Sequence, residues 1–147
     1  MSELEGGPPP PRVRLLRTRE EKAILREVAL SKKIPFLAYD PRAPGSFLVA
    51  LAGPHIVGAV GLVMDSHRIP GALGVGFVST HSDHRKQGVS KALVTALFEL
   101  ARQRNQALAN TAYEPDGERW LKPVMRRTAA LYPDVEFYER HERPVYA

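Results

Sequence analysis

One stretch decides the fold of this chain: Thr80-His81-Ser82-Asp83-His84-Arg85-Lys86-Gln87-Gly88-Val89-Ser90-Lys91. It follows an apolar, glycine-punctuated run, Leu73–Val78, that is typical of a strand. It precedes a segment in which apolar residues recur every three or four positions from Val89 to Ala101, the pattern of an amphipathic helix. The stretch is therefore predicted to join a strand to a helix.

Several residues of this junction suit an anion. Gly88 has no Cβ and Ser90 is small, so a ligand can approach the main chain closely. The first amide groups of a helix have no partner in a preceding turn, and the helix dipole favours negative charge there. Arg85, Lys86 and Lys91 add positive charge. An isolated match of this kind is more often an ordinary tight turn, but the flanking strand and helix favour a phosphate site here.

The pattern Arg85-x-x-Gly88-x-Ser90 resembles the central signature of the Gcn5-related N-acetyltransferases, Gln/Arg-x-x-Gly-x-Gly/Ala. Ser90 departs from that signature by a hydroxyl, which can contact a phosphate. The resemblance runs in element order from about Val13 to the C-terminus and is strongest over Gly74–Arg102. It implies acetyl-CoA, or another acyl-CoA, as the cofactor.

The resemblance also implies where the cofactor binds. The pyrophosphate would lie on the N–H groups of Lys86–Lys91, and the pantetheine arm would run along Val78–Thr80. The cofactor-binding residues are then Val78, Ser79, Thr80, Arg85, Lys86, Gln87, Gly88, Val89, Ser90 and Lys91.

Acyl transfer to an amine requires an acceptor for the proton of the amine and a donor for the departing thiolate. In the resembled family a carboxylate often fills the first role and a tyrosine of the last helix the second. Glu114 is our candidate for a base that acts through water, and Tyr113 is our candidate for the acid. The alternative is that Glu114 is an ordinary surface carboxylate and Tyr113 an ordinary aromatic residue at the end of a strand. Strand neighbours face opposite sides, so only one of the two can point into a site without a bulge. The family's usual Asn followed two helical turns later by Tyr has no clean counterpart, and Tyr132 comes too late in the sequence.

The remaining pattern predicts an α/β fold of the α+β kind, with a mixed, mostly antiparallel central sheet and flanking helices. Strands at 12–17, 47–52, 56–64 and 72–80 have short links that predict an antiparallel meander from the second onward. A helix over 88–105 then crosses to a parallel strand at 106–113. Thr18-x-x-Glu21 predicts a capping box for a helix that ends near residue 30, followed by a loop with room for one helical turn.

The C-terminal part is predicted to contain one more helix, over 118–131, which Pro123 delays or kinks. Trp120, Val124 and Leu131 are assigned to the core face of that helix. Strands at 135–138 and 144–147 close the sheet.

The length of the chain is that of one domain. We predict a proline-rich disordered tail over residues 1–11, followed by a single acyltransferase-like domain over residues 12–147. The chain has no cysteine, which excludes disulfides, a cysteine nucleophile and thiolate metal sites. Its histidines show no ligand spacing, so no metal site is predicted. The N-terminus lacks the pattern of a signal peptide and no apolar run reaches membrane-spanning length, so we expect a soluble cytoplasmic protein without a membrane partner.

The net charge of +5 is compatible with nucleic acid, an acidic partner or a polyanionic cofactor. Basic residues alternate with acidic ones and form no stripe interleaved with aromatics, so a solvated surface is favoured over a nucleic-acid site. We predict an N-acetyltransferase that moves an acetyl group from acetyl-CoA to a primary amine by direct attack. A catalytically inactive acyl-CoA-binding protein of the same fold and a basic nucleic-acid-associated protein are the alternatives. The class of the amine acceptor and the formation of a homodimer stay open.

Overall fold

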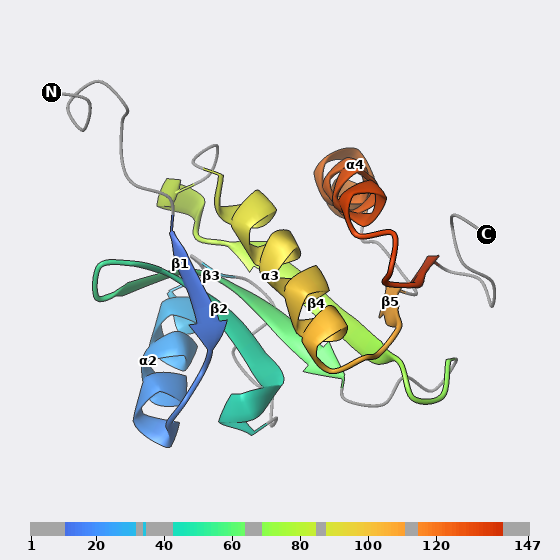
Figure 1. Ribbon diagram of the computed structural model, residues 1–147. Helices are drawn as coiled ribbons and strands as arrows, with labels where there is room; N and C mark the ends of the chain where they lie inside the picture. Colours follow the sequence, from blue (N-terminus) through green and yellow to red (C-terminus); the bar gives the residue numbers. More distant parts are fainter. Residues whose placement is uncertain are drawn as a thin grey trace, which may run out of the picture.

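The computed structural model describes residues 11–31, 34, 43–63, 69–84, 88–110 and 115–139, of which residues 115–118 are described by their backbone alone. A six-stranded sheet in the order β1-β2-β3-β4-β5-β6 forms its centre (Figure 1). The first four strands are antiparallel neighbours, whereas β4, β5 and β6 are parallel. The predicted mixed, mostly antiparallel sheet is thereby confirmed. The strands are β1 (Arg12–Leu15), β2 (Phe47–Ala52), β3 (His55–Val63), β4 (Leu73–Thr80), β5 (Leu108–Asn110) and β6 (Phe137–Glu139).

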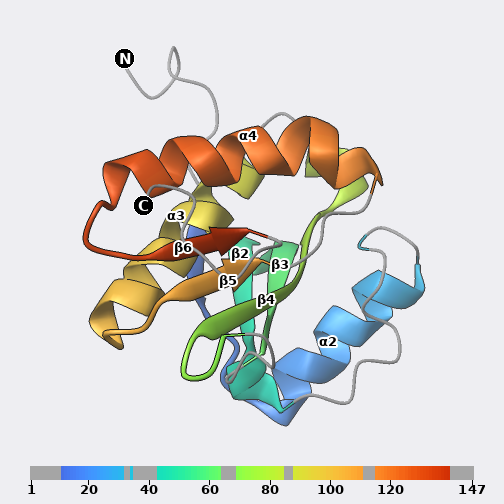
Figure 2. The same cartoon turned by 90° about the vertical axis from the view of Figure 1, so that its right-hand side faces the viewer.

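Helices cover both faces of the sheet. Helix α2 (Arg19–Leu30) packs on one face, and α3 (Val89–Gln103) and α4 (Pro115–Leu131) pack on the other (Figures 1 and 2). Two short 3-10 helices, η1 (Pro44–Ser46) and η2 (Ser82–His84), complete the described elements, and η1 is the single helical turn for which the loop had room. None of the helices in the described part of the chain is long and apolar enough to cross a membrane.

The sheet separates two apolar cores. The larger core lies under α3, whose apolar stripe is fully buried, and it includes the aromatic contacts of Phe98 with Tyr132 and Phe137 at centroid distances of 5.7 and 5.5 Å. The smaller core lies under α2 and includes Leu25, Phe47 and Val49. Because β2 contributes to both cores, its sequence is a continuous apolar run rather than an alternating one.

Helix α2 begins at the predicted cap. The Thr18 hydroxyl accepts a hydrogen bond from the Glu21 N–H at 3.1 Å. Glu21 does not complete the capping box, because its carboxylate accepts from the Arg17 N–H at 2.7 Å and pairs with the Arg14 guanidinium on β1. The first turn of α2 is therefore tied to the edge strand as well as to its own cap.

The C-terminal elements differ from the expectation in their bounds. Helix α4 begins at Pro115, three residues before the predicted start, and Pro123 lies inside it. A proline there removes the hydrogen bond to the carbonyl of Arg119, an exposed residue whose carbonyl water can satisfy. Strand β6 begins two residues later than predicted. Of the predicted strand 106–113 the structure shows β5 alone, and residues 111–114 and 144–147 lie outside the described part.

Of the three residues expected on the core face of α4, Val124 is partly buried and packs against the larger core, whereas two lie elsewhere. Trp120 is 38% exposed and Leu131 is 74% exposed, so their assignment is wrong. The buried apolar residues among those whose side chains are described recur every four positions instead, at Leu121, Met125 and Ala129. The bulk of Trp120 suggested burial, but the spacing of smaller residues decides which face packs.

Candidate cofactor site at the end of β4

The parallel ladder between β4 and β5 ends early. The two strands pair at Leu73 with Leu108 and at Gly74 with Ala109, and β4 then continues for six more residues. Asn110, the next residue of β5, pairs with Glu139 on β6 and not with β4. Figure 2 shows β4 running past the end of β5 toward the start of α3. We call this divergence of residues 75–80 from Asn110 the fork.

A bulge lies on β4 just inside the fork. The register between β3 and β4 shifts between Gly61, which pairs with Phe77, and Leu62, which pairs with Val75. Gly76 is the additional residue on β4, and it is exposed although its strand is otherwise largely buried. Bulges re-aim the backbone and are frequent beside binding sites. Sequence reasoning missed this bulge, and the glycine inside a strand pattern was its signal.

The chain passes from β4 into α3 through η2 and Gly88. Gly88 is the N-cap of α3 and has φ 78° and ψ 10°, a left-handed conformation that favours glycine. A Cβ added there would meet nothing within 4 Å, so the space beside Gly88 is open. The cap has no side-chain hydrogen bond. In a helix the amide groups of Val89, Ser90 and Lys91 have no carbonyl in a preceding turn, so they can bind an anion at this end.

The side chains of the junction divide between packing and exposure. Val89 is buried against the core, and Lys91 is exposed. The Ser90 hydroxyl lies 2.9 Å from the hydroxyl of Thr80, so it links the first turn of α3 to the end of β4. Ser79 and Val78 are also buried in this end of the strand. The structure thus brings Val78, Ser79, Thr80, Gly88, Val89, Ser90 and Lys91 to one strand-to-helix turn.

The other predicted site residues lie outside the described part of the chain. They are Arg85, Lys86 and Gln87 of the junction and the candidate catalytic residues Tyr113 and Glu114. In the sequence, Arg85, Lys86 and Gln87 directly precede Gly88, and Tyr113 and Glu114 directly precede Pro115, the first residue of α4.

Two histidines flank this turn. The His81 ring nitrogen Nδ1 accepts a hydrogen bond from the Asp83 N–H at 3.1 Å, and the His81 and His84 rings meet edge to face at 5.2 Å. These contacts stabilise η2. Among the described residues, no group of three or more His, Asp or Glu side chains is arranged to hold a metal ion.

Tyr132 contacts α3 and not the fork. Its hydroxyl donates to Glu99 on α3 at 2.7 Å, and the Arg102 guanidinium lies 5.0 Å from its ring centroid. The hydrogen bond to Glu99 is the main cause that raises the pKa of Tyr132. Tyr132 therefore ties the end of α4 to the C-terminal half of α3, away from the fork.

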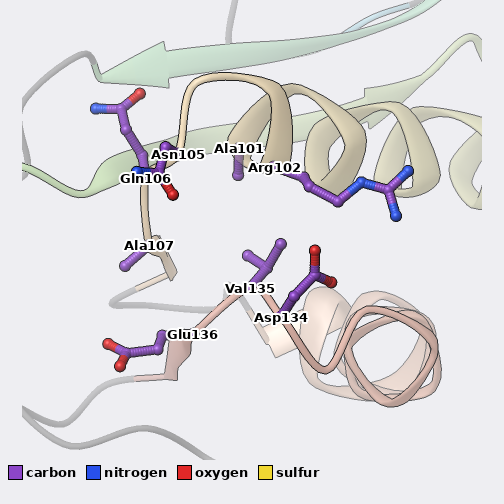
Figure 3. A pocket seen from close by; sticks show the side chains of 8 residues that line it. All are labelled: Ala101, Arg102, Asn105, Gln106, Ala107, Asp134, Val135 and Glu136. Carbon is purple, nitrogen blue, oxygen red and sulfur yellow. The ribbon is translucent and has the colours of Figure 1, made fainter.

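A surface hollow of about 390 Å³ lies beside the same end of α3. Figure 3 shows its side chains between the end of α3 and the segment that enters β6: Ala101, Arg102, Asn105, Gln106, Ala107, Asp134, Val135 and Glu136. Arg102 is engaged there by both carboxylate oxygens of Glu99 at 2.8 Å. A 15-residue helix is roughly 22 Å long, so this hollow is at the opposite end of α3 from Gly88.

Comparison with solved structures shows the same fold. The chain resembles Ard1 from Thermoplasma volcanium, with a TM-score of 0.57 and 15% identity over 81% of this chain and 82% of that one. It resembles a putative N-acetyltransferase from Lactobacillus plantarum with a TM-score of 0.57 and 17% identity, over 78% and 83% of the two chains.

The chain spans a smaller part of other similar structures. It covers 29% of Eis1 from Mycobacterium abscessus, with a TM-score of 0.53 and 19% identity over 71% of this chain. It covers 27% of the N-acetylglutamate synthase from Neisseria gonorrhoeae, a structure complexed with coenzyme A and N-acetyl-glutamate, with a TM-score of 0.57 and 12% identity over 77% of this chain.

No curated protein matches the sequence. The family model described as Acetyltransferase (GNAT) family matches residues 14–119, which include the end of β1, all of β2 to β5, α2, α3 and the junction. That match covers more than half of the chain, and the fork, the bulge on β4 and the glycine turn into α3 lie within it. This chain belongs to the Acetyltransferase (GNAT) family.

Proposed function

We propose that this protein transfers an acetyl group from acetyl-CoA to a primary amine. Membership of the GNAT family supports this activity. The main structural support is the strand-to-helix turn at Gly88 beside the fork. Gly88 in a left-handed conformation, with open space at its Cα, lets an anion approach the first amide groups of α3. The residues present therefore fit a cofactor that combines phosphates with an extended acyl arm.

Each end of the site has a defined task. The amide groups of Val89, Ser90 and Lys91 would hold the pyrophosphate, with Arg85, Lys86 and Gln87 beside it in the sequence. Backbone groups of β4 between Val75 and Thr80 that do not face β3 would hold the arm and polarise the acyl carbonyl. Bound acetyl-CoA supplies a thioester, and the acceptor amine attacks its carbon so that a C–N bond forms and the C–S bond breaks.

Glu114 and Tyr113 are proposed to move the protons. Glu114, through a water molecule, takes the proton of the acceptor amine, and Tyr113 is the candidate donor to the departing thiolate. Glu114→Gln should lower turnover and flatten its rise with pH while the affinity for CoA stays the same. Tyr113→Phe should lower turnover if the tyrosine protonates the thiolate. Wild-type rates in both variants would show that these residues supply no proton transfer.

The cofactor site is tested by two substitutions at Gly88. Asn and Asp both tolerate a positive φ and have nearly the same shape, so the pair differs mainly in charge. We expect Gly88→Asp to weaken acetyl-CoA binding at least tenfold relative to Gly88→Asn, measured by calorimetry. Equal affinities in two folded variants would contradict a phosphate at this turn.

Activity is tested by the release of free CoA. Acetyl-CoA and pooled amines are incubated with the protein and free thiol is measured with a thiol reagent, to which the cysteine-free chain contributes no background. Release that depends on an added amine supports the transferase. Acetyl-CoA binding without such release across small amines, peptides and protein lysines would support the inactive binding protein instead.

A further inference from the structure

Asn110 is a buried polar residue at the end of β5. It is 3% exposed, and its Nδ2 has no hydrogen-bond partner in the described part of the chain. Leaving a buried donor without an acceptor destabilises the folded protein, and native proteins contain few such groups. The amide of Asn110 therefore calls for a partner that the described protein atoms do not provide.

Asn110 lies at the apex of the fork. The β4–β5 ladder ends one residue before it, at the pair of Gly74 and Ala109. Strand alternation places Asn110 on the same face as Leu108, which belongs to the core under α3 and α4. Val75 and Val78 of β4 contribute to the same core. An extended ligand that ran along this face of β4 would therefore lie between β4 and the side chain of Asn110.

The residue across the ladder does not satisfy this amide. Asn110 pairs in register with Glu139, which is 5% exposed and lies on the same face of β6. The Glu139 carboxylate accepts instead from Arg126 on α4, at 2.5 Å from Nη2 and 3.1 Å from Nε. A charged pair of this kind holds the carboxylate more strongly than a neutral amide would. The ion pair fixes Glu139 toward α4 and leaves the Asn110 donor for another acceptor.

We infer that Asn110 is a ligand-binding residue whose Nδ2 donates a hydrogen bond to a carbonyl oxygen of the acyl-pantetheine arm, at the apex of the fork. This inference rests on the proposed function. The arm offers two sources of that oxygen, the acyl thioester and the amides of the pantetheine. Both are uncharged acceptors, which suit a neutral amide donor, whereas the phosphates suit the helix end at Gly88.

The test compares the binding of acetyl-CoA and of free CoA to wild type and to Asn110→Leu by calorimetry, together with the melting temperatures of both proteins without ligand. Leucine has a similar size and removes the unsatisfied donor. We therefore expect an equal or higher melting temperature and acetyl-CoA binding weakened about tenfold. Weaker binding of acetyl-CoA alone would identify the thioester oxygen as the acceptor. An equal loss of affinity for both ligands would identify a pantetheine amide as the acceptor.

A matched control is available on α4. Thr128 is also buried, but its hydroxyl already donates to the Val124 carbonyl at 2.8 Å. Thr128→Val makes the same change from polar to apolar, and we expect it to lower the melting temperature and leave both affinities at the wild-type values. A loss of affinity in Asn110→Leu without one in Thr128→Val separates a ligand contact from a general effect on packing.

Two outcomes would overturn the inference, and they differ from each other. Wild-type affinity of Asn110→Leu for both ligands would remove the role of Asn110 and leave the proposed function intact. Failure of the wild type to bind either ligand would remove the proposed function and this inference with it. Should Asn110→Leu not fold, Asn110→Ala carries the same comparison, because it also removes the donor.

Discussion

Gly58 lies on β3 where the first turn of α3 crosses the sheet. A Cβ at this position would be 2.7 Å from Val89 Cγ1, 3.0 Å from Leu93 Cδ1 and 3.1 Å from the Ser79 carbonyl oxygen. The first of these distances is shorter than carbon atoms tolerate. The glycine therefore allows the helix end that carries the proposed phosphate site to lie directly on the sheet.

Gly58→Ala should lower the free energy of unfolding by about 1–3 kcal/mol, the usual cost of overpacking. It should also weaken acetyl-CoA binding, because Val89 must move together with the first turn of α3. Urea unfolding and calorimetry measure the two effects. Gly45→Ala is the control, since a Cβ there meets nothing within 4 Å. Equal stability of the two variants would show that α3 can shift without cost.

Sequence reasoning reached some of these residues and missed others for physical reasons. Gly88 could be identified from the sequence because its neighbours form a local strand-to-helix pattern. Its left-handed conformation at the start of α3 agrees with the prediction that a glycine is required there. Gly58 and Asn110 are defined by contacts between segments far apart in the sequence, which no local pattern contains. The hydrogen bond between the hydroxyls of Ser90 and Thr80 likewise joins residues ten positions apart, and no local pattern predicts it.

The N-terminal turn of α2 contains a strongly perturbed carboxylate. The pKa of Glu21 is lowered from 4.5 to about 2, mainly by the hydrogen bond from Arg14 and next by the Arg17 N–H. A lowered pKa means that the folded state favours the ionised form. The resulting stabilisation is present above pH 4.5 and is lost as the pH falls toward 2.

Glu21→Gln should therefore destabilise the protein at pH 7 and much less at pH 2, so that its stability varies less over this range than that of the wild type. Urea midpoints between pH 2 and pH 7 measure the difference. Glu20→Gln, an exposed carboxylate of the same helical turn, is the control. A pH dependence of Glu21→Gln equal to that of the wild type would contradict a role for this ion pair.

At the level of elements, prediction worked best for α3 and for the strands of the antiparallel meander, whose apolar patterns are regular. Helix α3 and strands β2, β3 and β4 lie within two residues of their expected bounds. The strands β5 and β6 have three residues each, too few for a period to show. Their limits are set by pairing with each other and with β4, and the packing of distant strands decides such register.

The whole molecule has a net charge of +5. A protein that binds nucleic acid through phosphates releases counterions, so its affinity falls steeply as salt rises. We expect weak binding of a DNA or RNA duplex at low salt, most of it lost at about 150 mM salt, and competition by CoA. Fluorescence anisotropy over a salt series measures this. Tight binding at that salt concentration without competition by CoA would favour the nucleic-acid-associated alternative.

The unequal ladders of the sheet have a consequence for amide hydrogen exchange. β2 and β3 pair at six positions and are covered on both faces, whereas β5 pairs with β4 at two positions and with β6 at three. Short ladders open locally at lower free energy. Amides of β5 and β6 should therefore exchange with deuterium faster than those of β2 and β3. The fork is expected to separate the slowly and the rapidly exchanging parts of the sheet. Acetyl-CoA bound at the proposed site should therefore slow exchange most on the β5 side.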